Sequence, residues 1–370
     1  MKFSTSKTEL QQALQKLSKA SPTRSTLPIL SCVLVDSKED KTTLRTTDLE
    51  LTIQSEIPSS LEEPGVAALP LKTLLDITNE LPEVRLTITV DDKHRTTIET
   101  DLGKYDLVAK PPEEFPETPQ QKTPEQLDIP GRTLKEIINA TTFAVSKDEL
   151  KPALTGVLFQ VSPSGITAVS TDGHRLVKYT RRDHSSDSFS GELIIPKKFL
   201  TYMGSHLTEE VVQISVAENF IGAKIGNDKV LTRVISESFP NYETVIPKDN
   251  NKKLEVEKDL LLGSIRRVAI FSNKATHQVA LSLSQDLCSI STEDPEKSSK
   301  AQETISAQYE GDPITIGYNA EYLKDVVSHI SGNTVLVDLN TPVSAALFSS
   351  TATEEHTEST MLLMPIRLND

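Results

Sequence analysis

The dipeptide Thr47-Asp48 recurs as Thr171-Asp172, 124 residues further along the chain, and a weaker copy follows at Glu293-Asp294. Two other series of landmarks keep nearly the same period: helical apolar patterns that open at Leu10, Leu134 and Leu260, and the closing pairs Phe115-Pro116, Phe239-Pro240 and Met364-Pro365. Because independent features share one register, we expect one structural module to occur three times.

The length of 370 residues agrees with three modules, because one hydrophobic core rarely serves so long a chain. Each repeat is large enough to fold alone, unlike a solenoid repeat that needs stacked neighbours to bury its core. We expect domains at residues 1–120, 121–247 and 248–370.

Each repeat is expected to contain two helices among strands. The first helix carries apolar residues at helical spacing, such as Leu10, Leu14 and Leu17. A second helix is expected to begin at about residues 72, 198 and 319. Alternating apolar stretches predict strands at residues 30–35, 84–90, 156–161, 211–216, 279–283 and 334–339. This order predicts an α+β fold with antiparallel sheets rather than a series of parallel βαβ units.

The composition is that of an ordinary globular protein, with 36% hydrophobic and 25% charged residues. No apolar run approaches the length of a membrane span, and the first residues lack the apolar core of a signal peptide, so we expect a cytoplasmic protein. Cys32 and Cys288 form no CxxC motif and are expected to be buried free thiols.

Charge is unevenly distributed along the chain. The formal net charge is −14, yet the regions of the three opening helices, residues 7–20, 131–147 and 257–274, each carry +2. If equivalent faces of the modules point inward along an arc, these helices would hold a duplex through its phosphates without reading sequence. The alternative is that each charge excess is ordinary decoration of a solvated helix face.

Four motifs carry a resemblance to a known family: residues 26–30 (TLPIL), 171–176 (TDGHRL), 239–242 (FPNY) and 364–368 (MPIRL). In order and spacing they resemble the bacterial replicative sliding clamp, the β subunit of DNA polymerase III, over residues 1–368. The resemblance implies three like-folded domains per subunit and a head-to-tail homodimeric ring around duplex DNA. It also implies that no reaction is catalysed and that neither cofactor nor metal is needed.

The partners that the resemblance implies are double-stranded DNA, the polymerase III catalytic subunit, the clamp loader, and other polymerases and repair proteins that carry clamp-binding motifs; no membrane is involved. By similarity, the residues expected to face DNA are Arg24, Lys72, Lys147, Lys151, Lys197, Lys198, Asn319 and Tyr322.

A cleft for partner peptides is expected between the second and third domains. The matching positions are Leu154, Thr171, Gly173, His174, Arg175, Leu176, Pro240, Val245, Leu362, Met364, Pro365, Ile366, Arg367 and Leu368. Apolar side chains and the adaptable Met364 suit a groove that accepts several short motifs with Gln and Leu or Phe anchors, and Arg175 and Arg367 are expected at its rim. The last apolar stretch can equally be a core strand.

At the subunit joint we expect Tyr105 to face Ile270 and Phe271 of the partner subunit. The sequence departs from the family pattern at three places. Thr244 and Lys151 stand where family members carry arginine, and Asn369-Asp370 extends the usual end.

Two other classes of protein remain open. An enzyme could use Asp172 and His174 for acid–base chemistry beside Ser170, although no phosphate loop, HExxH helix or carboxylate cluster accompanies them. A peptide-binding repeat scaffold that never loads on DNA would also suit the groove and the acidic exterior.

Overall fold

The computed structural model describes residues 1–22, 24–38, 41–119, 124–184, 189–352 and 355–368. The Asn369-Asp370 extension lies outside these residues. The chain divides into two compact units, one of Met1–Arg132 with Lys198–Val234 and one of Thr133–Lys197 with Ile235–Asp370.

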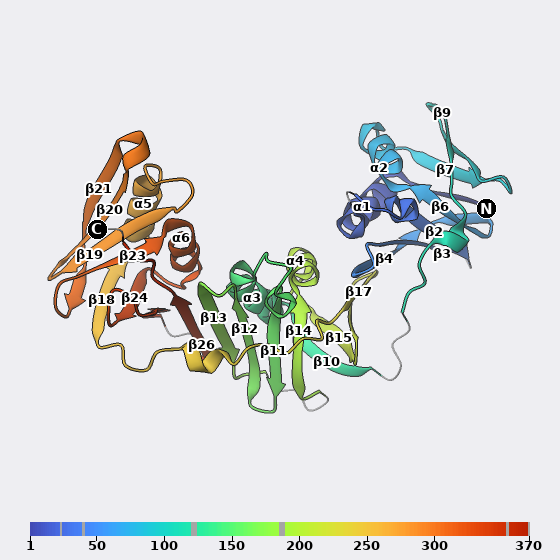
Figure 1. Cartoon of the computed structure of the whole chain (residues 1–370). Coiled ribbons are helices and arrows are strands. Elements are labelled where there is room, and N and C mark those ends of the chain that lie inside the picture. The colour runs from blue at the N-terminus through green and yellow to red at the C-terminus, as the bar shows by residue number, and fades with distance from the viewer. Residues whose placement is uncertain (23, 39–40, 120–123, 185–188, 353–354, 369–370) are drawn as a thin grey trace. The chain divides into compact units, whose positions relative to one another are not determined.

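Nearly the same series of elements occurs three times along the chain, with no counterpart of the short strands β5 and β22 among the described residues of the second repeat (Figure 1). The first repeat contains β1 (Lys2–Ser6), α1 (Lys7–Leu17), β2 (Cys32–Lys38), β3 (Lys41–Thr47), β4 (Leu51–Pro58), β5 (Ser60–Glu63), β6 (Gly65–Pro70), α2 (Leu71–Glu80), β7 (Arg85–Val90), β8 (Arg95–Thr100) and β9 (Gly103–Val108). The second contains β10 (Glu125–Pro130), α3 (Gly131–Thr141), β11 (Gly156–Ser162), β12 (Gly165–Thr171), β13 (Arg175–Arg181), β14 (Gly191–Pro196), α4 (Lys197–His206), β15 (Val211–Ala217), β16 (Phe220–Ile225) and β17 (Asp228–Arg233).

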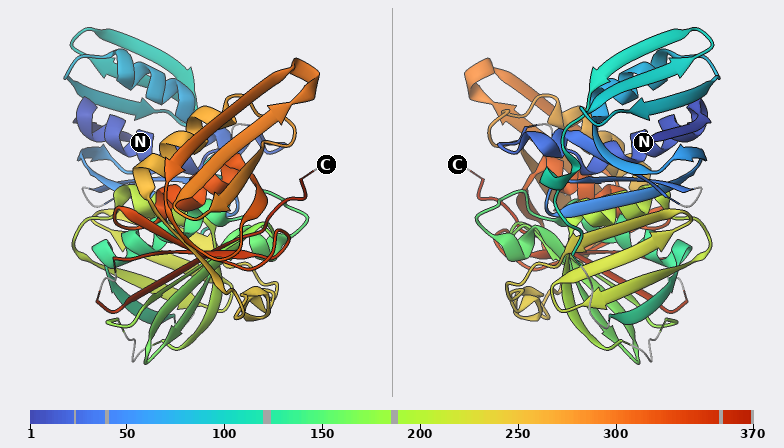
Figure 2. Two further views of the ribbon diagram at one scale, coloured as in Figure 1. Left: turned by 90° about the vertical axis from the view of Figure 1, so that its left-hand side faces the viewer. Right: turned by 90° about the vertical axis from the view of Figure 1, so that its right-hand side faces the viewer.

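The third repeat contains β18 (Lys252–Glu257), α5 (Lys258–Ala269), β19 (Gln278–Ser284), β20 (Leu287–Asp294), β21 (Ser299–Ser306), β22 (Gln308–Glu310), β23 (Ile314–Asn319), α6 (Ala320–His329), β24 (Thr334–Leu339), β25 (Ala346–Ser350) and β26 (Thr357–Leu363). Neighbouring strands pair antiparallel, as in the orange hairpin of β20 and β21 in Figure 2. The expected α+β fold, with two helices and antiparallel strands in each repeat, is confirmed.

Element boundaries differ from the expected ones where local chemistry intervenes. The strand expected from residue 30 begins at Cys32, because Pro28–Ser31 forms a 3-10 turn in which Leu30 N–H donates to the Leu27 carbonyl at 3.1 Å. The first helix begins at Lys7, ahead of its apolar stripe, because the Ser6 side chain accepts from Glu9 N–H at 3.2 Å and caps it.

Each unit holds one large and one small sheet. In the first unit the orders are β10-β15-β16-β17-β4-β3-β2-β6 and β5-β1-β7-β8-β9; in the second they are β14-β11-β12-β13-β26-β25-β24-β18-β22 and β21-β20-β19-β23. Strands of different repeats meet inside each large sheet, where β17 pairs with β4 and β13 pairs with β26. Repeats are therefore joined by continuous backbone hydrogen bonding as well as by the chain.

The repeated Thr-Asp dipeptide forms the same turn in the first two repeats. Asp48 Oδ1 accepts from the N–H groups of Glu50 and Leu51 at 3.1 and 2.7 Å, and Asp172 Oδ1 accepts from those of His174 and Arg175 at 2.9 and 3.0 Å. The residue after each Asp has positive φ, 79° at Leu49 and 89° at Gly173. The carboxylate therefore closes the turn between two strands, which explains why the dipeptide recurs.

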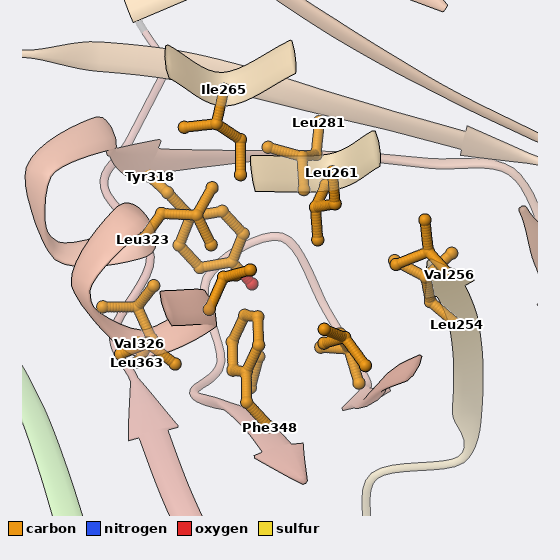
Figure 3. Close-up of a cluster of buried hydrophobic side chains, with 14 of the residues drawn as sticks. Leu254, Val256, Leu261, Ile265, Leu281, Tyr318, Leu323, Val326, Phe348 and Leu363 are labelled. Carbon is orange, nitrogen blue, oxygen red and sulfur yellow. The ribbon is translucent and has the colours of Figure 1, made fainter. Parts of the chain in front are cut away.

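The opening helices bury the predicted apolar stripes. In the third repeat Leu261, Ile265 and Val268 of α5 are at most 1% exposed. They belong to a cluster in which the rings of Tyr318 and Phe348 meet edge to face with centroids 6.3 Å apart (Figure 3). Within the described residues, no helix is both long and apolar enough to cross a bilayer.

Candidate functional site

The segment before β13 and the end of β26 come together in the second unit, although they lie almost 190 residues apart. Leu176 pairs with Leu362 across the two strands, and both belong to one buried apolar cluster. Met364 N–H, just beyond β26, donates to the His174 carbonyl at 2.8 Å. Residues predicted for partner binding from both segments are therefore neighbours.

The apolar cluster beneath these residues contains side chains that the sequence analysis missed. Its buried members are Leu158, Val169, Leu176, Ile194, Tyr242, Ala345 and Leu362. Val245 and Met364, both predicted for the partner site, remain 54% and 39% exposed. Val343, in the turn before β25, is 63% exposed and was not predicted. Tyr242 could have been found, because it belongs to the quoted FPNY motif.

Arg175 lies inside this site rather than at its rim. Its side chain is 8% exposed and makes three hydrogen bonds: Nε to Asp172 at 3.0 Å, one terminal nitrogen to Asp325 at 2.6 Å and the other to the Phe143 carbonyl at 2.7 Å. The expectation of a rim position is wrong for Arg175, since its side chain is buried and its Nε and both terminal nitrogens each donate to a protein acceptor. Arg367 is exposed.

Tyr322 was expected to face DNA, but it packs against the predicted partner-binding residues. The Arg175 guanidinium carbon lies 4.7 Å from the Tyr322 ring centroid, and the His174 ring stacks on Tyr322 at 5.6 Å. Burial and the charges of Asp172 and Asp325 raise the pKa of Tyr322. Asn319 has a local structural role, because its side-chain oxygen accepts from the N–H groups of Glu321 and Tyr322 and caps α6.

The remaining residues of the predicted partner site occupy the surrounding segments. Thr171 Oγ1 donates to the Arg175 carbonyl at 2.7 Å. Leu154 ends a 3-10 turn, and the Leu154 carbonyl accepts from Ser146 N–H. Gly173, with its positive φ, is exposed, and a Cβ there would meet nothing within 4 Å. Pro240 lies beside Phe239, which packs on the apolar cluster. Pro365, Ile366, Arg367 and Leu368 follow Met364 at the end of the described chain.

A group of cations lies near Arg175 in the same unit. Burial lowers the pKa of Lys197, and the positive charges of Lys147 and Arg175 lower it further, with partial compensation by Asp325. Lys147 and Lys151 are exposed on the loop that follows α3. A bound anion such as a phosphate would offset these positive charges beside Lys197.

The other basic residues expected to face DNA differ in their exposure and in their ion pairing. Arg24 and Lys72 are exposed, Lys72 at the second position of α2. Lys198 forms an ion pair with Asp48, which is 11% exposed, and burial lowers the pKa of Lys198. Its charge is therefore already balanced by the turn of the first repeat.

The residues expected at the subunit joint lie on the surface of their own units. Tyr105 is half-buried on β9, the last strand of the five-stranded sheet. Ile270 and Phe271 follow α5 and are 76% and 45% exposed. On the same edge as Tyr105, Val108 is 67% exposed, an apolar position that the sequence analysis did not name.

The catalytic alternative finds no support in the geometry. Ser170 is fully buried and its Oγ donates to the Thr141 carbonyl at 2.6 Å. Asp172 accepts from the backbone N–H of His174, and its other oxygen is paired with Arg175. Nowhere in the described ranges do three or more His, Cys, Asp or Glu side chains gather as a metal site would require. Both cysteines are buried, and burial raises their pKa values, that of Cys288 to about 12.

Comparisons with known proteins cover the whole chain. Family models of the N-terminal, central and C-terminal domains of the DNA polymerase III beta subunit match residues 1–119, 128–241 and 243–367. The beta sliding clamp of Chlamydia muridarum is 26% identical over 371 residues, with 100% of both chains covered. The solved sliding clamps of Bartonella birtlesii, bound to griselimycin, and Bacillus subtilis match with TM-scores of 0.94 and 0.93 at 26% and 27% identity, each with 100% of both chains covered.

The three family models follow one another over nearly every residue, in the order of the three repeats. This chain therefore belongs to the DNA polymerase III beta subunit family of sliding clamps, the non-enzymatic processivity factors that encircle duplex DNA and hold the replicative polymerase on it.

Proposed function

We propose that two copies of this chain close head to tail into a ring, with domains at residues 1–120, 121–247 and 248–370, and that the ring works in the cytoplasm. Its partners are the clamp loader, the polymerase III catalytic subunit, and other polymerases and repair proteins with clamp-binding motifs. A closed ring keeps a tethered polymerase at high effective concentration while weak phosphate contacts let it slide.

The joint of this ring brings Tyr105 of one subunit against Ile270 and Phe271 of the other. The proposal is supported by two consecutive exposed apolar side chains, since Ile270 is 76% and Phe271 45% exposed and contiguous apolar surface is typical of an interface. Ile270→Asp should convert a particle of twice 40.7 kDa into a monomer in sedimentation. Leu287→Asp, at another apolar position of the third repeat that is 47% exposed, should leave the particle size unchanged. A wild-type monomer at micromolar concentration would refute the ring.

The DNA contacts are proposed at Arg24, Lys72, Lys147, Lys151, Lys197, Lys198, Asn319 and Tyr322. The proposal is supported by the positive charges of Lys147 and Arg175 near Lys197, which an anion bound there would offset. Loading on nicked circular DNA with a clamp loader and ATP tests this. The clamp should remain on circles and leave after linearisation, and Lys147→Glu with Lys197→Glu should reduce retention more than the charge-matched pair Lys253→Glu with Lys248→Glu.

The partner site is proposed over the apolar cluster of the second unit, at Leu154, Thr171, Gly173, His174, Arg175, Leu176, Pro240, Val245, Leu362, Met364, Pro365, Ile366, Arg367 and Leu368. The hydrogen bond from Met364 N–H to the His174 carbonyl carries this proposal, because it joins the two sequence segments of the site. A labelled peptide with Gln and Leu-Phe anchors should bind the wild type in fluorescence anisotropy.

Met364→Asp should weaken this binding on the order of tenfold or more, since it places a charge on apolar contact surface. Leu287→Asp serves again as the matched control at an exposed apolar position. Equal affinity in the wild type and Met364→Asp would place the partner site elsewhere. His174→Ala should likewise weaken peptide binding while the dimer and its retention on circular DNA persist.

A further inference from the structure

The last described residues of the chain, Met364 to Leu368, are fastened at two points. We call them the C-terminal segment. Met364 N–H donates to the His174 carbonyl, and Ile366 N–H donates to the Gly317 carbonyl, both at 2.8 Å. Gly317 and Ile366 form an isolated antiparallel bridge. The first contact ties the segment to the turn before β13, and the second ties it to β23.

β23 offers a free edge for this contact. It is the last strand of the four-stranded sheet β21-β20-β19-β23, and its other side pairs with β19, where Gly317 stands opposite Ala280. Ile316 and Tyr318 on either side of Gly317 are each 1% exposed, so β23 is fixed in the core and cannot easily yield. Because Ile366 is only half-buried, we expect the C-terminal segment rather than β23 to shift when the two are forced apart.

The approach of the two backbones leaves no room for a side chain at Gly317. An added Cβ would lie 2.6 Å from the Ile366 carbonyl oxygen and 2.7 Å from Leu368 Cδ2. Gly317 does not have positive φ, so its backbone conformation does not require glycine. The lack of room for a Cβ atom does. Because one clashing atom is backbone, rotation of the Leu368 side chain alone would not relieve the overlap.

We propose that Gly317 is the positioning residue of the partner site: the absence of its side chain lets the C-terminal segment lie on β23, which sets where Met364 to Leu368 meet a bound peptide. This inference rests on the proposed partner site. With an alanine at 317, the Ile366 carbonyl must retreat by at least about 0.4 Å to reach even the 3.0 Å below which real Cβ contacts are essentially absent. Ordinary contact at 3.4 Å requires a retreat of about 0.8 Å, which would stretch the 2.8 Å hydrogen bond from Ile366 N–H to the Gly317 carbonyl to about 3.6 Å and so break the bridge if β23 holds its place.

The experiment compares Gly317→Ala with Gly191→Ala on β14, where a Cβ would meet only the Phe189 ring at an ordinary 3.4 Å. Hydrogen exchange of the C-terminal segment is measured first, without any ligand. The labelled peptide with Gln and Leu-Phe anchors is then titrated into each variant. Gly317→Ala should lose protection at Ile366 and bind the peptide on the order of tenfold more weakly, whereas Gly191→Ala should match the wild type.

A second variant acts from the segment side and leaves β23 untouched. Ile366→Pro removes the N–H group that donates to Gly317 and adds no atom to the core. It should raise hydrogen exchange at Met364, whose N–H donates to the His174 carbonyl, and weaken peptide binding in the same way, which decides the question if Gly317→Ala does not fold. Wild-type exchange protection and peptide affinity in the folded variants would overturn the inference. A wild type that binds no peptide would refute the partner site, while the exchange result would still decide the role of Gly317.

Discussion

Arg175 should be a costly side chain to remove from the second unit, because it is a buried cation. Its guanidinium is almost fully buried and is shared between Asp172, the Phe143 carbonyl and Asp325 of α6. Arg175→Ala removes the side-chain donor from Asp172 Oδ2 and from the Phe143 carbonyl. Breaking a buried ion pair on one side costs about 3–5 kcal/mol, and we expect a loss of this size in the free energy of local unfolding.

The contribution of each partner follows from its exposure. Asp325 is 48% exposed, so its contact with Arg175 is screened and should contribute only about 1 kcal/mol, measured as the coupling between Arg175→Ala and Asp325→Ala. Arg175→Lys keeps the charge but cannot reach three acceptors in three directions, so it should recover only a part of the loss.

Native-state hydrogen exchange of β13 and β26 is the suitable assay, because a chain of two units need not unfold in one step. Arg182→Ala is the matched control: the neighbouring arginine is 54% exposed and pairs with Glu358, itself 62% exposed. It should cost less than about 1 kcal/mol. If Arg175→Ala costs no more than Arg182→Ala, the reasoning from the burial and the three hydrogen bonds of Arg175 is wrong.

Three further predictions test the core, the thiols and the response to acid. Leu261→Ala should destabilise the third repeat by about 2–5 kcal/mol in urea unfolding, whereas Leu260→Ala, next to it but 45% exposed, should cost well below 1 kcal/mol. Cys288, whose pKa burial raises to about 12, should stay unreactive toward iodoacetamide until the protein is unfolded, and rapid native labelling would contradict its burial. The hydrogen bond from Arg181 lowers the pKa of Asp183 to about 2. The ionised Asp183 therefore stabilises the fold fully above the ordinary pKa of 3.8, and this stabilisation is lost as the pH falls from 3.8 toward 2. Asp183→Asn should flatten the plot of urea midpoint against pH in this range, and parallel curves for the variant and the wild type would refute the prediction.

Local patterns in the sequence were sufficient to predict the repeated module. Leu10, Leu14 and Leu17 mark one buried helix face, and such faces lie where the 3.6-residue period puts them. The pairing of β17 with β4 and of β13 with β26 was beyond such reasoning. These pairs join strands of different repeats, and the alternation within a strand says which face is buried but not which neighbour it will have.

The roles of individual polar residues were predicted less well than the elements that carry them. Asn319 and Glu321 form a helix-start pattern that the sequence displays, so the capping role of Asn319 could have been predicted from it. The burial of Arg175 could not, because its acceptors Asp325 and Phe143 come from segments 150 and 32 residues away. A count of charges along the sequence also treats Lys198 as a free cation, although in the folded chain Lys198 forms an ion pair with Asp48.

The first two repeats differ in the cationic side chain that pairs with the Asp of the shared turn. In both turns one Asp oxygen accepts two backbone N–H groups, and the other oxygen is paired with a cationic side chain. Position 175 carries arginine, but the position 124 residues earlier is Leu51, which is buried and uncharged. Asp48 instead receives Lys198 from α4 of the next repeat. The Asp of the turn is therefore common to the first two repeats, and the cation that pairs with it differs between them. In the first repeat the cation is a lysine from α4. In the second it is an arginine from the turn itself, which also binds Asp325 of α6 and so places His174 and Tyr322 together at the proposed partner site.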